Sequence, residues 1–140
     1  MTEPNSYAYF KFSGDFNPDL ITETLGIQPS EIGQKGEQGK YIKELKQSYW
    51  KLKSSDSKEK IFIEKMVEEV VSKLKSKAKI ISELKSKYQL NSVLEIVLYV
   101  DTNEEESTPA LGHSSEVIAF LYETGTVTDV DIYRYNSKEY

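Results

Sequence analysis

The chain has 140 residues, no cysteine and a formal net charge of −5, from 23 acidic and 18 basic side chains. This length suits a single domain over residues 1–140, with a core large enough to need no metal or disulfide. The absence of cysteine excludes disulfides, thiolate zinc sites, iron–sulfur clusters and a cysteine nucleophile, and the acidic charge disfavours nucleic acid as a partner.

The N-terminal third predicts a strand and then a short helix. Residues 7–12 alternate, with tyrosine and lysine on one face and alanine and phenylalanine on the other, which is the period of a half-buried strand. Asn17 before Pro18 is a typical cap and first residue of a helix, and Gly26 is placed to end it. Residues 27–40 hold a proline and three glycines, so we expect a loop or an irregular edge strand there.

The middle of the chain predicts a second strand and a long helix. Residues 48–54 alternate again, with Trp50 and Leu52 on one face. Between residues 58 and 88 apolar side chains recur every three or four positions, as in an amphipathic helix. A straight helix of that length would span about 45 Å, which exceeds the diameter of a small domain, so we expect a kink or break near residues 76–79.

The last third predicts strand, helix and strand. Residues 91–100 are apolar on both sides, which is typical of a central strand. Ser114 or Ser115 is placed to cap a helix that Gly125 ends, and residues 127–135 form the last strand. The element order predicts an α+β fold, in which helices cover one face of a mixed, mainly antiparallel sheet and one central helix is long or kinked.

Three segments carry a family resemblance: YAYFKFSGDFNPDLITETLGIQPS near the start, SYWKLKS in the middle and SSEVIAFLYETGTVTDVDIY near the end. Over almost the whole chain they resemble the bacterial domain-of-unknown-function family 4279. The matching positions are Gly14, Asp15, Phe16, Leu25, Gly26, Pro29, Lys35, Gly36, Trp50, Asp131, Ile132 and Tyr133. The loop after Pro29 departs from the pattern, because the family commonly places an aromatic residue or an arginine before the Lys35–Gly36 pair.

The resemblance implies a compact bacterial α+β domain with no assigned activity, so no catalytic residue is carried over. Members of the family are similar in style to small acidic proteins encoded near polymorphic toxins, some of which are immunity proteins. An immunity-type role is therefore the hypothesis that the resemblance adds.

The C-terminal strand carries the most suggestive polar pattern. Asp129 and Asp131 lie two residues apart and therefore point to the same face, where Tyr133 and Tyr135 follow. Paired carboxylates can bind a divalent cation, but a metal site needs further oxygen ligands. The nearest acids, at residues 104–106, lie on a separate polar loop. We therefore predict no metal and no cofactor, and interpret these residues as a solvated face or a contact face for a basic partner.

We expect a non-enzymatic binding protein, an immunity-type inhibitor whose acidic, tyrosine-bearing surface blocks a basic protein partner. The expected contact residues are Asp129, Asp131, Tyr133, Tyr135, Glu104 and Glu105, the last two with Glu106 on the acidic loop. No segment approaches the apolar length of a membrane span and the N-terminus lacks a signal pattern, so we expect a cytoplasmic protein that does not contact membranes.

Two alternatives stay open. One is a small-molecule-binding or enzymatic domain with a pocket near Trp50, Lys35 and His113. Lys35 next to Gly36 could meet an anion, and His113 is the only histidine, although a lone histidine before a helix is most often a structural residue. The other alternative is a homodimer built through the long helix.

Overall fold

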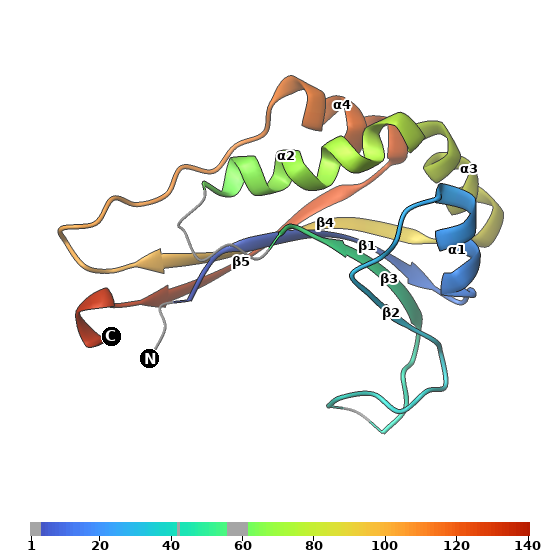
Figure 1. Cartoon of the computed structure of the whole chain (residues 1–140), viewed down its shortest axis with the longest axis horizontal. Helices are drawn as coiled ribbons and strands as arrows, with labels where there is room; N and C mark the ends of the chain where they lie inside the picture. The colour runs from blue at the N-terminus through green and yellow to red at the C-terminus, as the bar shows by residue number, and fades with distance from the viewer. Residues whose placement is uncertain (1–3, 42, 56–61) are drawn as a thin grey trace.

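The computed structural model describes residues 4–41, 43–55 and 62–140. In this part of the chain, a five-stranded sheet carries its helices on one face (Figure 1). In chain order the elements are β1 (Tyr7–Gly14), α1 (Pro18–Leu25), β2 (Glu31–Gly33), β3 (Ser48–Lys53), α2 (Ile63–Leu74), a 3₁₀ turn (Lys75–Lys77), α3 (Ala78–Tyr88), β4 (Asn91–Asp101), α4 (Ser115–Thr124), β5 (Val127–Tyr135) and a last 3₁₀ turn (Ser137–Glu139).

The strand order is β2-β3-β1-β4-β5. The β2–β3, β3–β1 and β1–β4 pairs are antiparallel, whereas β4 and β5 are parallel and are joined through α4, as a parallel pair requires a crossover. The predicted α+β fold with a mixed, mainly antiparallel sheet is confirmed. β4 is an interior strand, as its apolar run predicts, although β1 occupies the middle of the sheet.

Local sequence signals set the ends of two helices. The Asn17 side chain accepts a hydrogen bond from the backbone N–H of Asp19 at 3.0 Å, and Pro18 is the first residue of α1. Ser114 caps α4 in the same way. Gly26 and Gly125 end these helices with φ of 68° and 61°, in the left-handed region where glycine is favoured.

The predicted break in the long helix is confirmed. α2 ends at Leu74, the 3₁₀ turn at Lys75–Lys77 follows, and α3 begins at Ala78. After the break the two helices have different neighbours: α2 packs against β1 and β4, α3 packs against α1 and α4, and both bury their apolar stripes in the core. Residues 58–61, which the sequence also predicts as helical, lie outside the described residues.

The core lies between the sheet and the helices. Phe10 and Phe12 on β1 meet edge to face with ring centroids 4.9 Å apart, and both are fully buried together with Trp50 on β3. The Trp50 indole N–H donates to the Thr22 hydroxyl oxygen at 3.0 Å, which ties β3 to α1. None of the described helices is both long and apolar enough to cross a membrane.

Candidate functional site

The opposite face of the sheet carries no helix within the described chain (Figure 1). We call it the uncovered face. Because side chains alternate along each strand, it receives the residues that the core does not. Its members are Glu31 on β2; Tyr49, Lys51 and Lys53 on β3; Tyr7, Tyr9 and Lys11 on β1; Val93, Glu95, Val97 and Tyr99 on β4; and Val127, Asp129, Asp131, Tyr133 and Tyr135 on β5.

Charge divides the uncovered face into two halves. The basic half, on β3 and β1, holds three lysines beside tyrosine rings. The Lys51 ammonium lies 4.9 Å from the ring centroid of Tyr9 and also pairs with Glu31 at 3.4 Å, while the Lys53 ammonium lies 4.4 Å from the centroid of Tyr7. Both lysines therefore already have partners within the chain, an aromatic face for each and a carboxylate for Lys51.

A hollow of about 520 Å³ lies over the basic half. Its lining comes from Tyr7, Tyr9, Ser30, Glu31, Lys40, Lys51 and Lys53. Lys40 belongs to the β2–β3 connection, which projects on the uncovered side of the sheet (Figure 1). Burial, and then the nearby Glu95 charge, raise the pKa of Tyr9 to about 12. The Tyr9 phenol therefore stays neutral at physiological pH and offers no acid–base chemistry there.

The acidic half lies on β4 and β5. Glu95 is the cross-strand partner of Asp129, and Asp131 follows on the same face. One carboxylate oxygen from each of the three lies within 4.8 Å of the others. Only 6% of Glu95 is exposed, and its Oε1 has no hydrogen-bond partner among the described residues, whereas both aspartates are exposed.

Burial raises the pKa of Glu95 to about 8, and hydrogen bonding and charge from Asp131 and Asp129 add to the shift. The two aspartates favour the protonated form of Glu95 because a third negative charge next to theirs would be repelled. Near pH 7 Glu95 therefore keeps a proton that an ordinary glutamate would release. The negative charge of the acidic half consequently increases as the pH rises toward 8.

Tyrosines extend the acidic half toward the C-terminal end of β5. The rings of Tyr99 and Tyr133 stack with centroids 5.3 Å apart. The backbone N–H of Thr102 donates to the carbonyl oxygen of Tyr135 at 2.7 Å, which holds the loop after β4 against the end of β5. Glu104 and Glu105 are exposed on that loop. The structure thus brings the acidic loop to the same strand that carries Asp129, Asp131, Tyr133 and Tyr135.

The remaining candidate residues lie apart from one another. Trp50 is fully buried on the helix side of β3, and Lys35 lies on the loop after β2 with its backbone N–H bound to Ser48. His113 lies at the opposite edge of the sheet, where its Nε2 is 2.9 Å from the hydroxyl oxygen of Thr128 on β5. Since β3, β1 and β4 lie between the β2 edge near Lys35 and the β5 edge near His113, the geometry gives Trp50, Lys35 and His113 no common pocket.

The loop after β2 instead packs against the segment that follows β1. The Lys35 ammonium pairs with Asp15 at 3.2 Å, and both groups are at least half exposed. The Gln34 side-chain amide donates to the carbonyl oxygen of Phe16 and to the hydroxyl of Ser48, each at 3.2 Å. These contacts hold the loop at the sheet edge. Lys35 contributes to them through its ion pair with Asp15.

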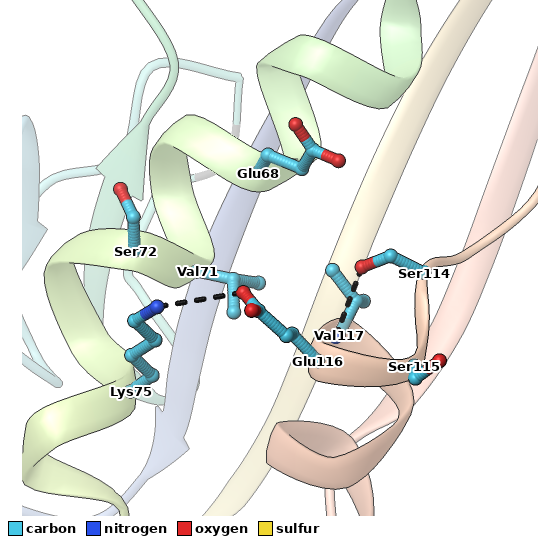
Figure 2. A pocket seen from close by; sticks show the side chains of 8 residues that line it. All are labelled: Glu68, Val71, Ser72, Lys75, Ser114, Ser115, Glu116 and Val117. Atoms are coloured by element: carbon cyan, nitrogen blue, oxygen red, sulfur yellow. Dashed lines mark hydrogen bonds and ion pairs between the residues drawn. The ribbon is translucent and has the colours of Figure 1, made fainter.

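A second hollow, of about 440 Å³, lies between α2 and the start of α4 (Figure 2). Lys75 and Glu116 pair across it at 3.4 Å, and the Ser114 hydroxyl is used to cap α4. The lining adds Glu68, Val71, Ser72, Ser115 and Val117. Two of its polar side chains therefore have structural roles: Lys75 joins the helix layer to α4 through Glu116, and Ser114 caps α4.

Comparison with known proteins places this geometry in a family. The family described as "Domain of unknown function (DUF4279)" matches residues 4–135. The chain belongs to this family. The match spans every strand of the DUF4279 sheet, including all the residues of the uncovered face. No curated protein and no solved structure matches the chain.

Sequence reasoning missed Glu95, the most buried acid among the residues that the structure describes. The available signal was a single charged residue inside the otherwise apolar run of residues 93–100. A charge in such a strand either faces solvent or has a specific partner. Its proximity to Asp129 depends on the parallel register of β4 and β5, which no local pattern in the sequence reveals.

Proposed function

We propose that the chain is a non-enzymatic binding protein and that the acidic half of its uncovered face contacts a basic protein partner. The specific form that we propose is an immunity-type inhibitor, which would act by covering a basic surface of its target. Glu95, Asp129, Asp131, Tyr133 and Tyr135 would form the centre of the contact, with the loop of Glu104 and Glu105 at its rim.

The observation that carries this proposal is an imbalance between the two halves of the face. Lys51 and Lys53 contact tyrosine rings, and Lys51 also pairs with Glu31. By contrast, the ion pairs between described residues include none of Glu95, Asp129 and Asp131. The two exposed aspartates are therefore left without an ion-pair partner among the described residues, and complementary charge on a partner would accelerate and orient its association.

Exposed apolar surface supports the same assignment. Tyr133 is 51% exposed next to the two aspartates, and its stacking on Tyr99 keeps the ring in place. A ring fixed before binding loses little entropy when a partner covers it, which is why tyrosine is common at binding hot spots. Val127 on the same face is also largely exposed. A sheet face with fixed aromatic rings between unpaired acids suits a protein surface that presents lysine and arginine.

The test is capture of a partner from the native host by the tagged chain, followed by purification of the complex. We expect one basic protein at a 1:1 ratio, lost as the salt concentration rises. Asp129→Lys combined with Asp131→Lys should abolish capture while thermal unfolding stays near that of the wild type, because both side chains are exposed.

The matched control is Glu64→Lys combined with Glu68→Lys on α2, which makes the same change in net charge on the exposed side of the helix layer. This variant should capture the partner as the wild type does. Capture that survives the β5 substitutions, or that fails in the α2 control as well, would contradict the proposed contact surface.

A further inference from the structure

Three carboxyl groups from two neighbouring strands converge on the uncovered face. Glu95 on β4 lies beside Asp129 on β5, and Asp131 lies two residues further along. One oxygen from each carboxyl group lies within 4.8 Å of the others. Oxygens that share a calcium ion at about 2.3–2.6 Å are separated by at most about 5 Å. The spacing therefore suits ligands of a single cation.

Glu95 distinguishes this group from an ordinary pair of exposed acids. Its exposed fraction is 6%, and its Oε1 is buried without a hydrogen-bond partner in the described part of the chain. A buried carboxylate oxygen that has lost water and gained no donor is unfavourable. The side chain brings a carboxyl oxygen within 4.8 Å of oxygens of Asp129 and Asp131, so a cation held by the three groups would compensate the buried carboxylate.

The surrounding charges leave room for a cation. On the neighbouring strand β1, Tyr9 lies opposite Glu95, and Lys11 lies diagonal to it. Lys11 supplies one positive charge beside the three carboxyl groups. The ion pairs between described residues include none of the three acids. A divalent ion would supply the compensation that these side chains do not.

We propose that Glu95, Asp129 and Asp131 bind a hard divalent cation, Ca²⁺ or Mg²⁺, with water completing its coordination. The three ligands are all carboxylate oxygens, which these ions prefer, whereas Zn²⁺ and Cu²⁺ favour nitrogen and sulfur. The two aspartates are exposed, so water has access to the remaining coordination positions. This inference does not rest on the proposed partner, because it concerns the free chain.

The experiment is calorimetric titration of the chelator-stripped full chain with calcium chloride and, separately, with magnesium chloride, at constant ionic strength. We expect one ion per chain and a thermal midpoint that rises with free ion, as mass action requires. Glu95→Gln should weaken binding at least about tenfold, because removing a ligand costs no less than removing an outer-shell partner. Asp129→Asn combined with Asp131→Asn should do the same, and these exposed substitutions leave the core intact.

A second readout locates the ion. Tb³⁺, a hard ion that substitutes for Ca²⁺, should give tyrosine-sensitised emission from a site beside the rings of the uncovered face, and the Asp129→Asn, Asp131→Asn variant should lose it. The control is Glu64→Gln combined with Glu68→Gln on α2, which removes the same number of negative charges and should bind Ca²⁺ and Tb³⁺ as the wild type does.

Two results would overturn the site. One is the absence of saturable binding of either ion up to about 10 mM, ten times the weakest dissociation constant expected of a protein Ca²⁺ site. The other is an unchanged affinity in the Asp129→Asn, Asp131→Asn variant, since nonspecific charge would then explain the binding. Neither result would contradict the proposed partner, because the aspartates can contact basic side chains without an ion.

Discussion

Replacing Glu95 by glutamine tests how far burial and the two aspartates perturb this carboxyl group. In the native state the pKa of Glu95 is raised from 4.5 to about 8 by burial first and by Asp131 and Asp129 next. The native chain therefore keeps a proton that the unfolded chain releases. The resulting stabilisation is complete below about pH 4.5, and it is lost as the pH rises toward 8.

The magnitude follows from linkage. Each pH unit over which the two states differ by one proton changes the free energy of unfolding by about 1.4 kcal/mol. Between pH 5 and pH 7 the wild type should therefore lose about 2 kcal/mol relative to Glu95→Gln. The groups facing Glu95, namely Tyr9, Lys11, Asp129 and Asp131, remain in both proteins, so the difference reports Glu95 together with its interactions with them.

The assay is urea unfolding followed by Trp50 fluorescence, from pH 5 to pH 9, with a chelator present so that no divalent ion contributes. Glu123→Gln, on the exposed side of α4, is the control and should run parallel to the wild type. Parallel curves for Glu95→Gln and the wild type across this range would refute a strongly raised Glu95 pKa, and with it the description of the acidic half.

Three further predictions concern packing and binding. Gly33→Ala should destabilise the fold by about 1–2 kcal/mol in urea unfolding, because the added Cβ would clash with the Tyr49 ring. Gly112→Ala, where the added Cβ would have nothing within 4 Å, should be neutral, and equal effects of the two substitutions would contradict this reasoning. Thr22→Val should cost about 1–3 kcal/mol by leaving the buried Trp50 indole N–H without its acceptor, and the cost should exceed that of Thr24→Val on the exposed side of α1. Millimolar calcium should weaken capture of a basic partner more than sodium chloride of equal ionic strength does, as a pull-down would show; equal effects of the two salts would separate the cation site from the partner surface.

The elements that the sequence predicted well depend on local signals. Alternation along residues 7–12 and 48–54 and the caps at Asn17 and Ser114 involve residues within a few positions of each other, so they could be read without knowing the fold. The helix break at Lys75–Lys77 was also predictable, because the length of the amphipathic pattern exceeded the size of the domain. Strand order and register were not predictable, because they depend on pairings between distant segments.

The candidate site also has a part that local sequence predicts and a part that depends on strand pairing. Asp129, Asp131, Tyr133 and Tyr135 share a face because they alternate along one strand, which the sequence alone predicts. Their proximity to Glu95 needed the parallel pairing of β4 with β5. The prediction that Lys35 and His113 share a pocket was based only on the chemistry of the two side chains. The sheet places these residues at opposite edges. A ligand-induced thermal shift that His113→Ala removes would still support that alternative.

The most direct test of the proposed contact surface is the affinity of the purified partner for three forms of the chain at one salt concentration. These are the wild type, the Asp129→Lys, Asp131→Lys variant and the Glu64→Lys, Glu68→Lys control. The β5 substitutions should weaken binding by at least about 100-fold, because two acids that attract the partner become lysines that repel it, while the α2 control should bind like the wild type. Wild-type affinity in the β5 variant would contradict the central claim.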